Sequence, residues 1–90
     1  MPVTFSIVVT GKVQGVYYRQ STRDKALELG LTGEVSNQAD STVLIVATGE
    51  LSQLEALIRW CRTGPPRSLV AGVFPKEVSL KQFGGFSILR

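Results

Sequence analysis

The spacing of apolar residues along the chain alternates between the two-residue period of a strand and the three-to-four-residue period of a helix. This succession of periods constrains the fold more than any single motif. It predicts strand, helix, strand, strand, helix and strand, followed by a short closing strand. The expected ranges are 3–11, 18–29, 31–37, 43–48, 51–62, 68–75 and 85–90.

Individual residues support these boundaries. Gly30 is expected to end the first helix, because glycine readily adopts the left-handed backbone that closes many helices. Ser52 and Glu55 have the spacing of a capping box at the start of the second helix. Pro75 cannot donate a hydrogen bond to a neighbouring strand, so the strand at 68–75 is expected near a sheet edge.

The two helices must cover one face of the sheet, since each has an apolar stripe to bury. The order βαββαβ therefore predicts an α+β fold, the ferredoxin-like α/β sandwich, with an antiparallel sheet and a short extra C-terminal strand. We expect one domain over residues 1–90. This fold hosts many unrelated activities, so function has to be argued from a site.

The chain contains no histidine, which excludes several kinds of active site. A histidine metal site, a serine triad and a histidine general base are all impossible. The only cysteine, Cys61, can form no internal disulfide and is expected in the core rather than in a redox role. Without a recognisable targeting or membrane-spanning segment, the chain is expected to be cytoplasmic. Its net charge of +3 fits a small anionic ligand as well as a polymer.

The stretch "GKVQGVYYRQST", residues 11–22, is the strongest candidate for a site. It joins the first strand to the first helix, whose start has unpaired N–H groups and a partial positive charge. Gly15 allows the unusual backbone angles of a concave, N–H-lined loop. Arg19 adds a guanidinium that can grip two oxygens of a phosphate. The alternative is that Gly11 and Gly15 are ordinary turn residues and Arg19 is solvated.

Two polar residues could complete such a site. Asn37 ends the second strand, and in this topology that strand end can approach the loop. Alone, Asn37 would also fit a residue that starts a turn. Thr22 could brace the start of the first helix, or simply belong to its buried stripe.

The sequence resembles the acylphosphatase family. The resemblance rests on "GKVQGVYYRQST", "LGLTGEVSNQADSTV", Gly49, "CRTGPPRSLVAGV" and "FGGFSILR", in that order and spacing. It implies hydrolysis of the carboxyl–phosphate anhydride of small acyl phosphates to a carboxylate and inorganic phosphate. It also implies that no metal or cofactor takes part, and that the fold is the one inferred above.

The resemblance also assigns roles to individual residues. It implies that the phosphoryl group is bound by a loop made of Gln14, Gly15, Val16, Tyr17, Tyr18 and Arg19. Arg19 would contact the phosphate, and Asn37 would orient the attacking water. The expected partners are a small acyl phosphate and inorganic phosphate, with no nucleic acid and no membrane, and the expected state is a monomer.

Two positions depart from the pattern of the family. Glu34 stands where a tryptophan is usual, which raises a question about surface packing or substrate access. Ser41 stands where a glycine is usual, and a side chain at a positive-φ position costs about 1–2 kcal/mol. Neither departure removes a residue that the resemblance implies is catalytic.

Two other functions compete with hydrolysis. A module that binds phosphate or acyl phosphate without turnover would carry the same loop, although the presence of both Arg19 and Asn37 argues against it. RNA-recognition domains share this topology, but they stack bases on aromatic residues of their central strands. The stretch 43–48, "VLIVAT", has no aromatic residue, so RNA binding is disfavoured.

Overall fold

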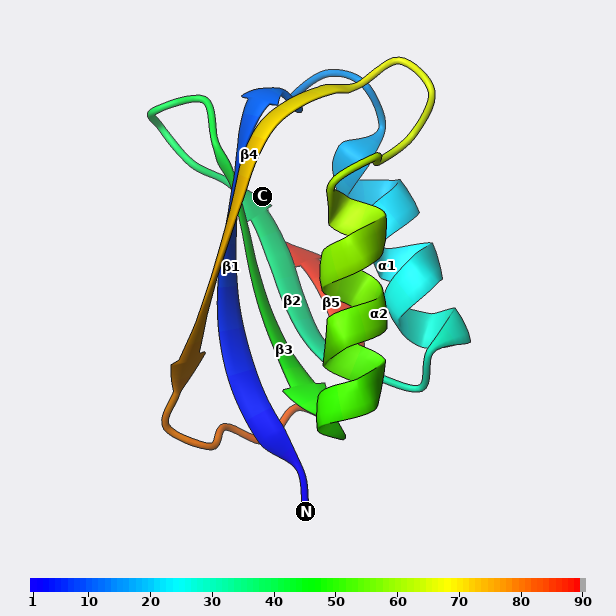
Figure 1. Ribbon diagram of the computed structural model, residues 1–90, viewed down its shortest axis with the longest axis vertical. Helices are drawn as coiled ribbons and strands as arrows, with labels where there is room; N and C mark the ends of the chain where they lie inside the picture. The colour runs from blue at the N-terminus through cyan, green and yellow to red at the C-terminus, as the bar shows by residue number, and fades with distance from the viewer. Residues whose placement is uncertain (90) are drawn as a thin grey trace.

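The computed structural model describes residues 1–89, and its elements follow the predicted order (Figure 1). Arg90, the last residue of the predicted closing strand, lies outside the described residues. The elements within the described range are β1 (Val3–Lys12), α1 (Tyr18–Glu28), β2 (Thr32–Asn37), β3 (Val43–Gly49), α2 (Leu51–Cys61), β4 (Leu69–Val78) and β5 (Phe86–Leu89).

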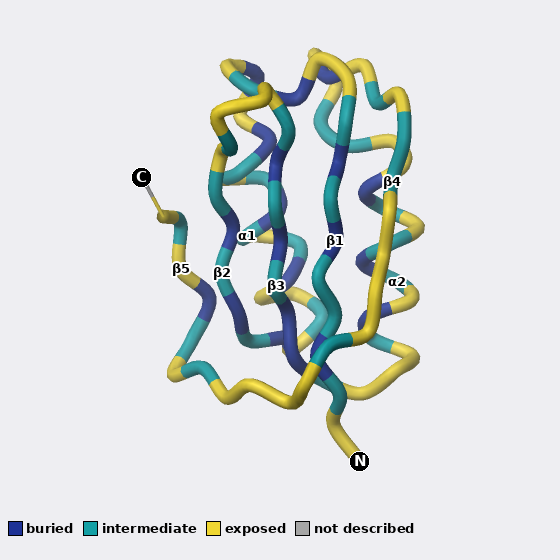
Figure 2. Tube along the Cα trace, turned by 90° about the vertical axis from the view of Figure 1, so that its left-hand side faces the viewer, coloured by how far each residue is buried: buried dark blue, intermediate teal, exposed yellow. Residues whose placement is uncertain are grey.

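The described strands form one sheet in the order β4-β1-β3-β2-β5. The four long strands pair antiparallel, as predicted, but β5 runs parallel to β2, so the sheet is mixed. Strand β4 is at an edge, which confirms the expectation from Pro75. Both helices lie on one face of the sheet, and Figure 2 shows the opposite, open face. The fold is the predicted ferredoxin-like sandwich.

The core lies between the helices and the covered face of the sheet. Helix α1 buries Tyr18, Thr22 and Ala26, three residues of the predicted stripe. The stripe of α2 is confirmed for Leu54, Leu57 and Cys61, which are fully buried, whereas Ile58 is only partly buried. The strand residues that face the helices are fully buried, and they include Ile7, Val9, Val35, Val43 and Ile45.

The start of α2 differs from the prediction. The capping box uses Glu50 and Gln53 instead of Ser52 and Glu55, and the backbone N–H of Glu50 donates to Gln53 Oε1 at 2.8 Å. Glu50 has an extended backbone, with φ −71° and ψ 149°, while the helix already begins at Leu51. Ser52 is therefore inside the first turn, where it cannot act as the cap.

The segment between β4 and β5 crosses one end of the open face. There the backbone carbonyl of Lys81 accepts a hydrogen bond from Thr48 Oγ1 at 2.6 Å, and the N–H of Lys81 donates to Thr4 Oγ1 at 2.9 Å. These contacts bury Thr4, although it alternates with the core-facing residues of β1. They also hold the segment that leads to the edge of β2, where β5 pairs with β2.

The two departures from the family pattern lie away from the helix-covered face. Glu34 alternates with buried Val35 and faces the open side, where its carboxylate lies 3.9 Å from Lys81 Nζ. In the hairpin, Ser41 has φ 74°, so the expected positive φ is present without glycine. Thr42 donates to Asp40 Oδ1 from both its N–H and its hydroxyl, which braces the turn and lowers the pKa of Asp40.

No helix in the part of the chain that the structure describes is long and apolar enough to cross a membrane.

Candidate active site

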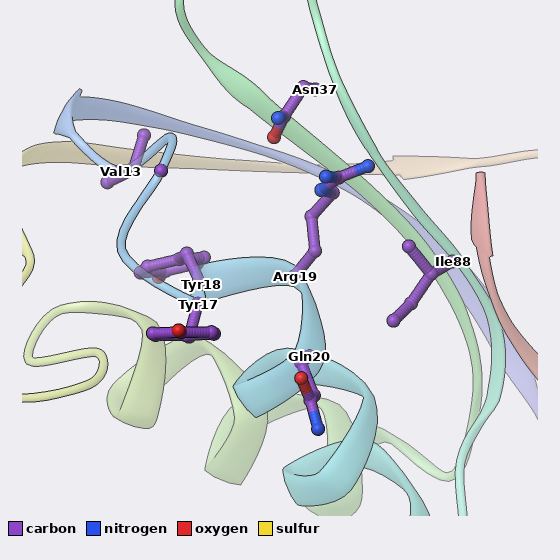
Figure 3. Close-up of a pocket in the computed structure, with 8 residues that line it drawn as sticks. Val13, Tyr17, Tyr18, Arg19, Gln20, Asn37 and Ile88 are labelled. Atoms are coloured by element: carbon purple, nitrogen blue, oxygen red, sulfur yellow. The ribbon is translucent and has the colours of Figure 1, made fainter. Parts of the chain in front are cut away.

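A pocket of about 390 Å³ opens where the β1–α1 loop meets the end of β2 and the side of β5 (Figure 3). Its lining comes from three parts of the chain that are distant in sequence: residues 13–20, the end of β2 and β5. The lining residues are Val13, Gly15, Tyr17, Tyr18, Arg19, Gln20, Asn37 and Ile88. The structure therefore brings Arg19 and Asn37 into one pocket, as the sequence analysis expected.

The loop leaves β1 through unusual backbone. The pairing of β1 with β4 shifts register between Thr10 and Gly11, and a Cβ at Gly11 would collide with the carbonyl oxygen of Leu69. Further along, Gly15 has φ 73° and Tyr17 has φ 62°. Left-handed residues close together in a short loop can turn successive N–H groups toward one side, which is the geometry of an anion-binding nest.

The start of α1 is open to an anion. Its N-cap, Tyr17, makes no side-chain capping bond, and the first turn contains no acidic residue. The N–H of Ser21 donates to the Tyr17 carbonyl at 3.0 Å, so the N–H groups just before it precede the hydrogen-bond ladder of the helix. Unpaired N–H groups and the helix dipole together favour a negative charge at this place.

Val16 in the loop and Tyr18 at the start of α1 anchor the site to the core. Val16 is buried, and Tyr18 is 1% exposed. The Tyr18 hydroxyl donates to the Cys61 carbonyl at 2.7 Å, at the end of α2. Its ring lies 5.5 Å from the ring of Trp60, measured between centroids. These contacts fix the start of α1 against α2 and hold the loop between β1 and α1 in place.

The buried Tyr18 and Cys61 predict a loss of stability at alkaline pH. Burial raises the pKa of the Cys61 thiol from 9.0 to about 12, and burial raises the pKa of Tyr18 above its ordinary 10.0. The unfolded chain releases these protons at lower pH than the folded chain, so rising pH favours unfolding. We expect the urea midpoint to be steady below about pH 8 and to fall progressively above about pH 9.

The matched control for this prediction is Cys61→Ala. It removes the thiol but keeps the backbone carbonyl that accepts the Tyr18 hydrogen bond. Its urea midpoint should begin to fall at a higher pH than that of the wild type. A wild-type midpoint that is unchanged up to pH 11 would contradict this account of the core.

Gln14 and Val16 do not line the pocket with their side chains. The side-chain Nε2 of Gln14 donates to the carbonyls of Gln38 and Thr42, each at 2.9 Å. Gln14 thus ties the loop to the hairpin that directly follows Asn37. These two hydrogen bonds hold the loop next to the end of β2. Gln14 therefore contributes to the site by positioning the loop.

The side chain of Arg19 is held in place by a hydrogen bond to β5. Its Nη1 donates to the carbonyl of Leu89 at 3.0 Å, which leaves the other guanidinium N–H groups for a ligand. In Figure 3 the side chains of Arg19 and Asn37 extend toward each other across the pocket, and Ile88 lies beside Arg19. Gln20 points away from both. Thr22 is buried in the helix stripe, and its hydroxyl donates to the Tyr18 carbonyl at 2.7 Å.

The sequence analysis missed the contribution of β5. Ile88 and the Leu89 carbonyl belong to a four-residue strand whose partner in the sheet was not predicted. Its pairing alongside β2 is what brings it to the pocket. Alternation of Phe86 and Ile88 indicated a strand, but no local signal indicated which strand it would join.

A protein-family model, described as acylphosphatase, matches residues 5–88. The chain belongs to the acylphosphatase family. An acylphosphatase from Marinobacter nauticus is 55% identical over 76 residues, which cover 84% of this chain and 83% of that protein. The structure of an acylphosphatase from Coxiella burnetii has a TM-score of 0.95 and 38% identity, and the match covers 98% of this chain and 93% of that chain. A Bacillus subtilis acylphosphatase structure has a TM-score of 0.94 and 33% identity, with both chains fully covered.

This membership confirms the family and the enzyme class that the sequence resemblance implied. The chain is a hydrolase of acyl phosphates. Within residues 1–89, no group of three or more Asp, Glu, Cys or His side chains gathers in a way that could hold a metal ion.

Proposed function

We propose that the pocket between the β1–α1 loop and the end of β2 is the active site, and that it cleaves the anhydride bond of small acyl phosphates. The observation that carries this proposal is the convergence of Arg19 and Asn37 at an uncapped helix start. In this proposal the N–H groups of residues 14–18 and the first turn of α1 cradle the phosphoryl oxygens. Arg19 binds the same oxygens with the N–H groups that Leu89 leaves free.

The cradle stabilises the transition state by charge. Phosphoryl transfer passes through a loose transition state in which negative charge spreads over three equatorial oxygens. Donors that are already oriented toward those oxygens need no rearrangement during the reaction, and each is typically worth about 3–4 kcal/mol. Arg19 is preoriented by the Leu89 carbonyl, and the loop is preoriented by Gln14, Val16 and Tyr18.

Asn37 would position the attacking water. Its side-chain amide can both accept and donate hydrogen bonds, but it is too weak a base to remove a proton. Holding the water in line with the phosphorus lowers the entropic part of the barrier. The leaving group is a carboxylate whose acid has a pKa of about 4, so it departs without a proton from a general acid.

Several further properties belong to this proposal. The reaction needs no metal or cofactor, because the cradle supplies the positive potential and the leaving group needs no activation. Every residue that lines the pocket comes from this chain, so the proposed site needs no second copy, and we propose a monomer. The proposed ligands are a small acyl phosphate and inorganic phosphate, and the proposal includes no nucleic-acid or membrane partner. The buried free thiol of Cys61 suits the reducing conditions of the cytoplasm, where we propose that the protein acts.

The test is hydrolysis of benzoyl phosphate by the purified protein in the presence of a chelator. We expect release of one inorganic phosphate per benzoate, far above the background rate, and competitive inhibition by inorganic phosphate. Consumption at only the background rate, with phosphate still bound, would instead identify a binding module without turnover.

A further inference from the structure

Tyr17 presents an exposed aromatic ring at the pocket in a backbone conformation that tyrosine rarely adopts. It is 72% exposed and lines the pocket, and its φ of 62° and ψ of 23° are left-handed. Tyrosine side chains are on average only partly exposed, and left-handed positions are normally occupied by glycine or asparagine. Tyr17 departs from both expectations at a single position.

Nothing in the fold of the described chain accounts for this ring. Within residues 1–89 we find no side-chain hydrogen bond and no ring pair made by Tyr17, whereas its neighbour Tyr18 has both. At Gly15, two residues earlier, the same loop uses glycine for its left-handed backbone. Strained residues of this kind persist mainly at binding sites, where the strained conformation places a side chain for a ligand.

The pocket has a polar part and an apolar part. Arg19, Asn37 and the N–H groups of the helix start form the polar part, where the proposed function places the phosphoryl group. Val13, Tyr17 and Ile88 also line this pocket; Figure 3 shows Val13 and Tyr17 on the side of the β1–α1 loop and Ile88 on the other side of Arg19. A phosphoryl group satisfies only the polar part. In the bound substrate, the acyl group attached to the phosphoryl group must extend out of the cradle, into space that these apolar side chains border.

We propose that Tyr17 is a specificity-determining residue whose ring contacts the acyl group of the substrate. This inference rests on the proposed function. The ring offers a flat apolar surface without direct hydrogen-bonding demands on the acyl group, so it favours acyl phosphates with an aromatic or extended apolar acyl group over acetyl phosphate. An aromatic contact of this kind corresponds to about a three- to tenfold preference.

The test compares kcat/KM for benzoyl phosphate and acetyl phosphate in three proteins. Tyr17→Asn removes the ring but keeps a residue that tolerates the left-handed backbone, and Tyr17→Phe keeps the ring without its hydroxyl. We expect the benzoyl-to-acetyl ratio to fall about three- to tenfold in Tyr17→Asn and to stay near the wild-type value in Tyr17→Phe.

The ratio separates this role from a general one. Damage to the phosphate cradle would lower kcat/KM for both substrates in the same proportion and leave their ratio unchanged. An unchanged ratio in Tyr17→Asn would therefore overturn the inference, while the proposed function would stand. If the benzoyl-to-acetyl ratio fell in Tyr17→Phe as well, the inference would also be overturned, because Tyr17→Phe keeps the ring. If the wild type hydrolyses neither substrate, the proposed function fails first, and the inference fails with it.

Discussion

Arg19→Ala is expected to lower kcat/KM for benzoyl phosphate by about a thousandfold or more, and to weaken inhibition by inorganic phosphate. Arg19 is the pocket residue with a permanent positive charge, and its guanidinium is already oriented by the Leu89 carbonyl. Alanine removes the positive charge that stabilises both the bound phosphate and the transition state. KM should therefore rise and kcat should fall. Steady-state kinetics with phosphate as inhibitor measures both effects.

Two further variants sharpen this prediction. Arg19→Lys keeps the charge but cannot grip two oxygens at once, so it should recover only a small part of the lost activity. Arg59→Ala removes the same charge from an exposed position on α2 and should behave like the wild type. Equal activity in Arg19→Ala and Arg59→Ala would remove Arg19 from the mechanism.

Asn37→Ala is expected to lower kcat by about a hundred- to a thousandfold, while inhibition by inorganic phosphate changes less than about twofold. The proposed role of Asn37 is to hold water, and it carries no charge that would attract the phosphate. The loop and Arg19 should therefore still bind the anion. The comparison of kcat with the phosphate inhibition constant separates the two roles.

Gln82→Ala is the matched control for Asn37. It also removes an exposed side-chain amide, from the segment between β4 and β5 rather than from the pocket, and it should leave kcat unchanged. Wild-type kcat in Asn37→Ala would contradict water positioning by this residue. A large loss of phosphate inhibition would instead show that Asn37 belongs to the anion cradle.

The parts of the fold that were predictable are those set by local periodicity. Helix α1 and strands β2 and β3 lie within a residue or two of their expected ends, because their apolar stripes and their glycine or polar ends are local features. The candidate pair was also predictable, since Arg19 and Asn37 stand at the ends of elements that this topology brings together.

The parts that could not be predicted depend on tertiary contacts or on competing local signals. The parallel pairing of β5, which supplies Ile88 and the Leu89 carbonyl, is decided by where the preceding segment crosses the sheet. At the start of α2, two overlapping spacings could each form a capping box. The extended backbone of Glu50 selects one of them, and sequence pattern alone does not reveal that angle.

The most direct test of the central claim is a crystal structure of the protein with bound inorganic phosphate. The account predicts that the phosphate occupies the pocket at the start of α1, accepts hydrogen bonds from the N–H groups of the loop and from Arg19, and leaves Asn37 within reach of a water beside the phosphorus. A phosphate bound elsewhere, with the Arg19 and Asn37 side chains turned away from each other, would contradict it.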